Sequence, residues 1–141
     1  MTRIDFHTNI SDKLTYACRL SRKALAAGGK LVLLADDAAQ AAQLNDALWT
    51  FSDTDFLPHV LAGDALAPRT PIIVTHDETA DFPHADMLVN LTRRVPSTVD
   101  KFQRVFEIIS TDEDDAAAGR KRYVAYKQQS YPLTHFVAGQ T

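Results

Sequence analysis

The sequence predicts a three-layer α/β/α fold built around a mostly parallel sheet. Short apolar runs of strand length alternate along the chain with longer segments in which apolar residues recur at helical spacing. This alternation is typical of a sheet covered by helices on both faces. The 141 residues include no linker-like segment, so we expect residues 1–141 to form a single domain.

The first quarter of the chain reads as strand, helix and strand. Residues 3–7 alternate apolar and polar side chains, as a half-buried strand does. Residues 11–27 have one apolar side, and Ser11 is in position to cap the helix that they predict. After two glycines, residues 31–35 form an unbroken apolar run, which favours a strand buried on both faces.

The next segment reads as a helix followed by a loop. Asp36 or Asp37 can cap a helix over residues 38–50. Residues 51–70 are rich in loop-forming residues, although 60–61 fit a short edge strand.

The second half of the chain supplies further strands and the longest helix. Residues 97–109 predict a short helix that is followed by a strand from about Arg104. A long helix is expected over 112–128, with four acidic residues at its start, where the helix dipole favours them. The tail at 131–136 is expected to lie over the surface. The remaining strand candidates are 72–74 and 87–91.

Composition indicates a soluble globular protein. The hydrophobic fraction is 45%, the charged fraction is 23% and the net charge is −3. A nucleic-acid-binding surface would therefore need a local basic patch. The single cysteine, Cys18, excludes an internal disulfide and a cysteine-rich zinc site, and we expect it to pack as a small apolar group. No apolar run approaches the length of a membrane span and no signal region opens the chain, so we expect a cytoplasmic protein.

The motifs of nucleotide-binding proteins are missing from a fold that often binds nucleotides. Neither G-x4-G-K-[ST] nor G-x-G-x-x-G occurs, although the phosphates of a nucleotide need such loops. Asp36 and Asp37 follow a strand at the edge where ligands often bind. Helix capping explains them most simply, and a metal or ribose contact is the alternative.

Catalytic and metal-binding patterns are also missing. His76, Asp77, Glu78, His84 and Asp86 lie close together in the sequence but lack the helical spacing of a metal site. No serine stands in a G-x-S-x-G turn. We therefore expect no catalytic residues, no metal and no cofactor, and a function in binding.

One candidate binding surface lies on the last helix. Arg120, Tyr123, Val124 and Lys127 recur at i, i+3, i+4 and i+7, and therefore share one face. Two cations around an aromatic and an aliphatic side chain suit an acidic peptide with a terminal apolar residue. The alternative is an ordinary amphipathic helix whose basic side chains extend over apolar surface.

A second candidate surface is the aromatic segment that contains the only tryptophan. Trp49 lies beside the apolar stripe of its helix, and Phe56, Pro58 and His59 follow closely. Two aromatic rings flanked by proline form a rigid apolar platform for a partner. Trp49 could equally cover the edge of the core. His59 could donate to a partner or bond the loop backbone.

The order and spacing of these motifs resemble the chi subunit of bacterial DNA polymerase III, a non-catalytic part of the clamp-loader assembly. The resemblance rests first on L-W-T-F-x4-F-L-P-H-x-x-A-G at residues 48–63. Further matching segments cover nearly the whole chain: 17–20, 31–36, 88–91, 95–96, 102–110 and 120–126.

The resemblance implies two protein partners. Chi subunits bind the psi subunit, and the positions that match this interface are Trp49, Phe56, Pro58 and His59. They also bind the acidic C-terminal tail of single-stranded DNA-binding protein, which ends in a Pro-Phe carboxylate. The positions that match the tail site are Ile109, Arg120, Tyr123, Val124 and Lys127. The family would place the protein in the bacterial cytoplasm, at the nucleoid through the replication machinery.

The chain departs from the family pattern in the tail site. Val124 and Ala116 stand where relatives can carry basic residues, whereas Lys121 and Arg122 keep the region positive. We therefore expect tail binding that is weaker or centred differently.

Two rival interpretations remain. Residues 29–36 look somewhat like a degenerate helicase or nucleotide-binding domain. The other is direct binding of single-stranded DNA through the basic residues of the last helix, with Tyr123 and Tyr126 stacking on bases. The net negative charge argues against strong nucleic-acid binding.

Overall fold

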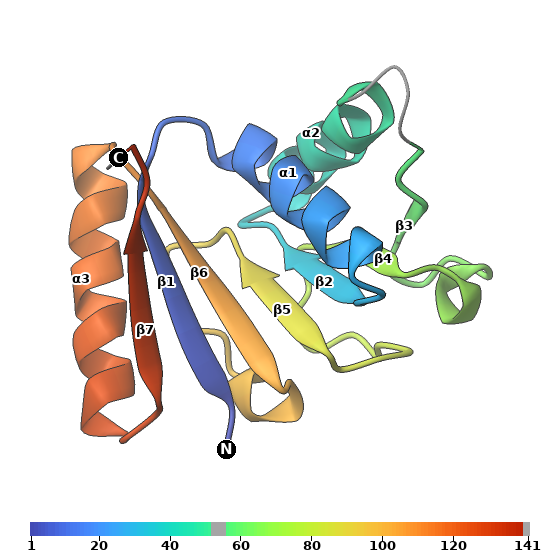
Figure 1. The fold of residues 1–141 in the computed structure, drawn as a ribbon. Helices are drawn as coiled ribbons and strands as arrows, with labels where there is room; N and C mark the ends of the chain where they lie inside the picture. Colours follow the sequence, from blue (N-terminus) through green and yellow to red (C-terminus); the bar gives the residue numbers. More distant parts are fainter. Residues whose placement is uncertain (52–55, 140–141) are drawn as a thin grey trace.

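The structure is a computed structural model that describes residues 1–51 and 56–139. Its described residues form one seven-stranded sheet in the order β3-β4-β2-β5-β6-β1-β7, and every neighbouring pair is parallel (Figure 1). The strands are β1 Arg3–Ile10, β2 Leu31–Leu34, β3 His59–Leu61, β4 Ile72–Thr75, β5 Met87–Asn90, β6 Arg104–Ser110 and β7 Leu133–Val137. The predicted fold class is confirmed.

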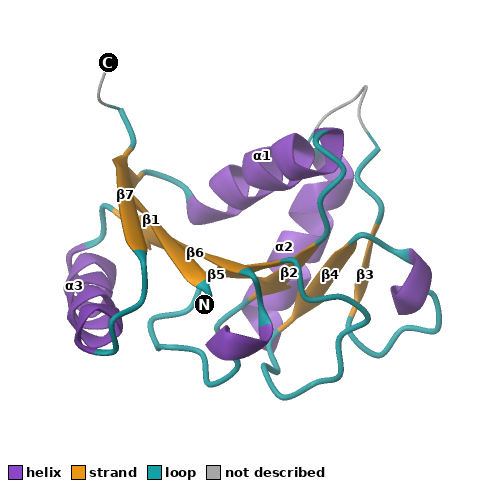
Figure 2. Ribbon diagram, turned by 60° about the horizontal axis from the view of Figure 1, so that its bottom comes forward, coloured by secondary structure: helices purple, strands orange, loops and turns teal. Residues whose placement is uncertain are grey.

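The helices lie on both faces of this sheet. They are α1 Lys13–Ala26, α2 Ala38–Thr50 and α3 Glu113–Gln128. Helices α1 and α2 cover one face over the central strands, and α3 lies on the other face beside β1 and β7 (Figure 2). Two apolar clusters fill the spaces between these layers, one on each face of the sheet. The short 3-10 helices are η1 Ala67–Arg69 and η2 Val99–Lys101.

The helix starts follow from capping side chains. Asp37 caps α2 and accepts a hydrogen bond from the Gln40 N–H, as predicted. The cap of α1 is Asp12, whose carboxylate accepts from the Thr15 N–H, so the prediction of Ser11 was wrong by one residue. The two oxygens of the Asp12 carboxylate accept hydrogen bonds from the backbone N–H and from the hydroxyl of Thr15. The cap therefore makes two hydrogen bonds to the first turn of the helix.

The strands agree with the sequence pattern except at the chain ends. The edge strand at 60–61 and the change from a short helix to a strand at Arg104 are confirmed. The first strand is longer than predicted and continues to Ile10, past an irregularity at Asn9, whose φ is 62°. Residues 52–55 of the predicted loop lie outside the described residues.

The tail was predicted to lie over the surface, and that prediction was wrong. It forms β7, which pairs with β1 and makes one edge of the sheet. The sequence of β7 does not show the apolar alternation of a strand, because its three central residues are all exposed. A strand with little burial has no apolar alternation, and pairing with β1 is the main interaction that places it in the sheet.

The start of α3 is fixed by a buried ion pair. Asp115 is 2% exposed and lies 3.1 Å from the Lys13 Nζ of α1. It also accepts a hydrogen bond of 2.7 Å from the Ser110 N–H. Burial raises the pKa of Asp115. The contacts with Ser110 and Lys13 together lower it by more than burial raises it, so that the net pKa lies below the usual value.

This shift predicts a pH-dependent contribution to stability. Because the folded-state pKa is lowered, the stabilisation is present above the unfolded value of 3.8 and is lost as pH falls through the folded value. We expect Asp115→Asn to lower the free energy of unfolding by about 1–3 kcal/mol at neutral pH. Urea unfolding of both proteins from pH 7 downwards checks this. A difference that stays constant below pH 3.8 would contradict it.

Candidate protein-binding sites

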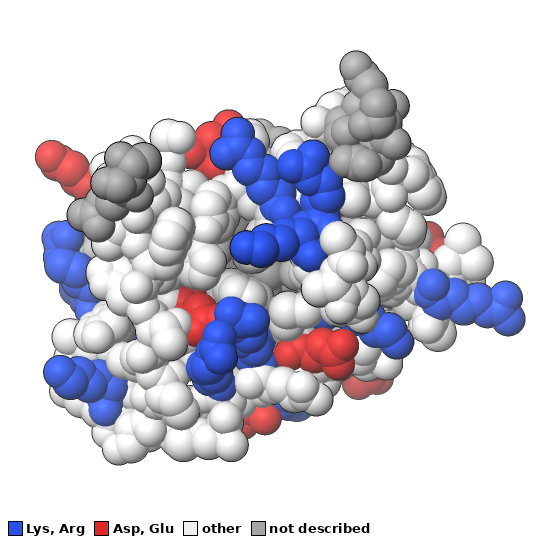
Figure 3. Space-filling view, in the orientation of Figure 1, with Lys and Arg blue, Asp and Glu red and all other residues white. Residues whose placement is uncertain are grey.

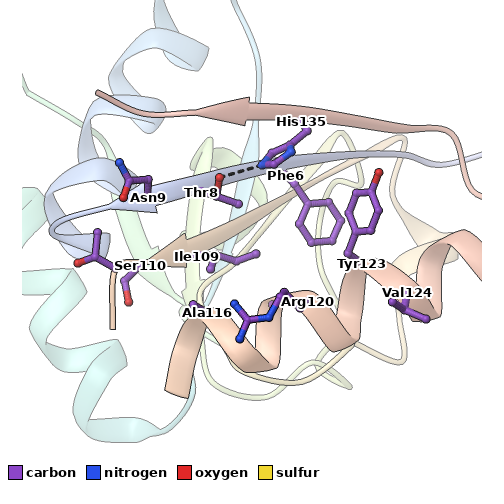
Figure 4. Close-up of a pocket in the computed structure, with 12 residues that line it drawn as sticks. Phe6, Thr8, Asn9, Ile109, Ser110, Ala116, Arg120, Tyr123, Val124 and His135 are labelled. Carbon is purple, nitrogen blue, oxygen red and sulfur yellow. Dashed lines mark hydrogen bonds between the residues drawn. The ribbon is translucent and has the colours of Figure 1, made fainter. Parts of the chain in front are cut away.

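A cavity of about 680 Å³ lies between α3 and the strands β1, β6 and β7 (Figure 4). Four of the five residues that the sequence assigned to a tail site line it: Ile109, Arg120, Tyr123 and Val124. Ile109 comes from β6 and the others from α3, so tertiary packing brings the predicted residues together. Lys127 is not among the lining residues and lies exposed further along α3.

The floor of the cavity depends on a close approach between β6 and α3. Gly119 faces Ile109, and a Cβ at position 119 would lie 2.5 Å from the Ile109 Cδ1 and 2.8 Å from its Cγ1. Only glycine therefore leaves room for this isoleucine without movement. Ile109 is buried, and it gives the cavity an apolar floor.

One wall is aromatic and is held rigidly. The ring of Tyr123 packs edge-on against that of Phe6, with 5.1 Å between centroids. Above them, the His135 Nε2 and the Thr8 Oγ1 are hydrogen-bonded at 2.8 Å, which joins β7 to β1 at the rim (Figure 4). A wall of packed rings and a bonded rim provides a preformed site, as ligand cavities usually do.

The charge at the cavity comes from Arg120. It is exposed on α3 beside the cavity, and no acidic side chain is among the described lining residues. Ala116 and Val124 add apolar surface on the same helix. The arrangement suits a ligand with one apolar group for the floor and a carboxylate for Arg120.

Arg122 does not contribute to this positive surface. It is 2% exposed, and its Nε donates a hydrogen bond of 2.9 Å to the buried Glu107. Tyr126 is also buried and donates to Glu107 at 2.6 Å. The expectation that both Lys121 and Arg122 keep the region positive therefore holds for Lys121 alone. Binding of DNA along α3 would also lack Arg122 and Tyr126, because neither can reach a ligand.

The second surface lies at the end of α2. Trp49 is 56% exposed and Phe56 is 69% exposed. Their ring centroids are 5.6 Å apart, so the two rings form a joint exposed platform. Large aromatic side chains seldom stay so exposed without a partner. Trp49 therefore does not serve mainly to cover the core.

His59 supports this platform from below. Its ring centroid lies 4.6 Å from that of Trp49. The residue is 5% exposed, and its two ring nitrogens lie 2.6 Å and 3.2 Å from the carbonyl oxygens of Leu57 and Asn45. Of the two roles left open by the sequence, His59 performs the internal one. It bonds the backbone and fixes Trp49, while Pro58 stays half-buried next to it.

The other chemical candidates have structural explanations. Asp36 pairs with Arg94 at 3.1 Å. Cys18 is buried, and burial raises the pKa of its thiol to about 11. Within residues 1–51 and 56–139, no three His, Cys, Asp or Glu side chains are grouped to hold a metal ion. The helices of that same part of the chain are all too short or too polar to span a membrane.

Sequence reasoning missed several residues of the cavity. Phe6, Thr8, Asn9 and His135 line it from β1 and β7. No local signal identifies them, because their position depends on the pairing of the two strands. Their place in the cavity follows from the pairing of β1 with both β6 and β7 and from the packing of α3 against that face.

Comparison with known proteins supports one family over nearly the whole chain. The family described as DNA polymerase III chi subunit, HolC, matches residues 1–134. The DNA polymerase III subunit chi of Pseudomonas aeruginosa is 35% identical over 94% of both chains. That of Haemophilus influenzae is 26% identical over 84% of this chain and 82% of its own. That of Escherichia coli is 23% identical over 82% of this chain and 79% of its own.

Proposed function

This chain belongs to the DNA polymerase III chi subunit family, and from that premise we propose that it is a non-catalytic accessory subunit joining two proteins. One is the psi subunit, which connects chi to the clamp loader. The other is single-stranded DNA-binding protein, held by its acidic C-terminal tail. In this role the protein works in the bacterial cytoplasm, at the nucleoid, within the replication machinery.

The main support for the proposal is the cavity between α3 and the strands β1, β6 and β7, which we call the tail cavity. Its floor at Ile109 accepts an apolar side chain, and Arg120 lies where a carboxylate of the peptide can be bound. A C-terminal residue with an apolar side chain offers both groups on one unit. The preceding acidic residues of the tail would meet a surface on which Lys121 and Lys127 are also exposed.

The positions of the two sites suit a linking protein. The tail cavity lies on the face that α3 covers, whereas Trp49 ends a helix that covers the opposite face. One partner can therefore bind without blocking the other. Many tails on one coated DNA strand would raise the effective concentration of the tail near the cavity, so that a modest affinity suffices.

The tail site is tested by titrating the protein with a peptide that copies the C-terminal tail. We expect saturable binding that weakens with salt. Arg120→Ala should weaken it by about 1.5–3 kcal/mol, because a hydrogen bond to a charged group is lost. Isothermal titration calorimetry measures both effects.

Arg69→Ala is the matched control, because it removes the same charge from an exposed position on η1 that neither lines the cavity nor lies on α3. It should change the affinity by much less than Arg120→Ala. Equal losses in both variants would mean that the peptide responds to overall charge and does not enter the cavity. Absence of binding at low salt would refute the tail site.

A further inference from the structure

No described helix covers one face of the sheet over β7, β1 and the first half of β6, where Arg3 and Arg104 lie over the buried Asp5 and Phe106. In the described part of the chain, α1 and α2 cover the neighbouring central strands on this face, and α3 packs on the opposite face (Figures 1 and 2). The strand register places seven side chains on it, which we call the open face: Arg3, Asp5, His7, Arg104, Phe106, Thr134 and Phe136.

The open face carries an exposed aromatic ring. Phe136 on the edge strand β7 is 53% exposed. Its ring packs against that of His7, with 5.5 Å between centroids. His7 in turn contacts Phe106 at 5.5 Å and is hydrogen-bonded to Tyr16. Phe136 is thus the outermost ring of a packed group and presents a firm surface to solvent.

Cations flank this ring on the strands. Arg3 and Arg104 both donate hydrogen bonds to Asp5, which is 2% exposed and also accepts from Thr134. Two guanidinium groups for one carboxylate leave a net positive charge. The side chains of Arg3 and Arg104 remain 51% and 40% exposed, so both can contact a second anion.

Helix α1 extends the positive charge along the same side. Arg19, Arg22 and Lys23 are exposed at i, i+3 and i+4, and the sequence of α1 includes no acidic residue. Figure 3 shows basic side chains gathered over α1 and over the first halves of β1 and β6. The guanidinium of Arg22 also lies 5.1 Å from the centre of the Phe51 ring.

His7 joins the strands of the open face to α1, because its ring is hydrogen-bonded to Tyr16 of that helix. Burial lowers the pKa of His7, and the positive charges of Arg104 and Lys23 lower it further, against the opposing effect of Asp5. Positive charge therefore continues from the strands to the helix across the open face.

We propose that the open face and the basic side of α1 bind single-stranded DNA. The cations would contact successive phosphates, and a base would stack on Phe136. A single strand fits better than a duplex because its bases are free to stack on a side chain. The net charge of −3 makes the binding weak, and it would add to the tail interaction because the tail cavity lies on the opposite face.

The proposal is tested by the fluorescence anisotropy of a labelled oligothymidine of about 15 nucleotides, a length within the site sizes of single-strand-binding domains. We expect saturable binding at low salt. The double variant Arg19→Ala with Lys23→Ala should reduce the slope of log affinity against log salt by about 0.7 for each phosphate that the variant no longer neutralises. Phe136→Ala should weaken binding by about 5- to 150-fold, as expected when one base no longer stacks.

The control double variant is Arg69→Ala with Lys121→Ala, which removes one arginine and one lysine from exposed positions outside the open face. It should bind the oligonucleotide like the parent protein. Circular dichroism of each variant verifies that the fold is intact, and the tail-peptide affinity of the α1 variant should be unchanged.

Four outcomes would overturn the proposal. They are no binding at low salt, equal losses in the α1 and control variants, equal affinity for duplex DNA, and displacement of the oligonucleotide by the acidic tail peptide. The last outcome would show that the open face is a site for acidic proteins or that the DNA occupies the tail cavity. The first three do not bear on the tail site itself, whose separate test uses Arg120.

Discussion

Replacing Glu107 with alanine is expected to lower the free energy of unfolding by about 3–5 kcal/mol, the usual cost of breaking a buried ion pair by removing one partner. Glu107 is fully buried on β6 and accepts hydrogen bonds from Asn90, Arg122 and Tyr126. The Nη1 and Nη2 atoms of Arg122 have no hydrogen-bond partner among the described residues. Without Glu107, the guanidinium would be a buried cation with no counter-charge.

Urea unfolding followed by circular dichroism measures this loss. Because Glu107→Ala is liable not to fold, Tyr126→Phe provides a milder variant that removes one bond to the carboxylate and should cost about 1.5–3 kcal/mol. Lys121→Ala, an exposed neighbour on α3, should stay within about 0.5 kcal/mol of the parent.

A double substitution separates the charge effect from simple loss of packing. Glu107→Leu combined with Arg122→Met removes both charges together, and we expect it to regain most of the stability that either single change costs. If the double variant were as unstable as the sum of the single variants, the buried pair would not be the source of the effect.

Replacing Trp49 with alanine is expected to weaken binding to the psi subunit by about 2–4 kcal/mol, the range of an interface hot spot. The ring is 56% exposed, adjoins Phe56 and is held by His59. A large ring that is fixed before binding loses little entropy when a partner covers it. The stability of the isolated protein should change little, because the ring is mostly outside the core.

Titration calorimetry with the psi subunit of the same organism measures this effect. Leu66→Ala is the matched control, since Leu66 is a comparably exposed apolar residue, at 60%, outside the Trp49 platform. It should leave the affinity unchanged. An unchanged affinity of the Trp49→Ala variant for psi would refute the assignment of this surface.

The Trp49 platform was largely predictable from its sequence, because its members are close neighbours along the chain. The tail cavity was predictable only in part. The helical spacing of Arg120, Tyr123 and Val124 placed them on one face of α3, as found. The same periodicity could not show that Lys127 lies beyond the lining residues, because the extent of a cavity depends on the strands that close it.

Burial of charged residues was the main point that local pattern did not reveal. Arg120, Lys121 and Arg122 are adjacent and chemically similar, yet the first two are exposed and the third is buried. What distinguishes Arg122 is a carboxylate on β6, at Glu107, which is distant in the sequence. A buried ion pair becomes visible only when both partners are placed.

The sequence by itself determined the parallel α/β fold, most strands and helices, and the polar face of α3, because apolar periodicity and capping are local properties of the chain. The family was visible in it only through the resemblance of its motifs, in order and spacing, to those of known proteins. Tertiary structure alone decided the rest. The pairing of β7 with β1 closes the tail cavity and adds the edge of the open face. Strand pairing joins residues far apart in the chain, so a strand with little apolar surface is specified by its neighbour more than by its own residues.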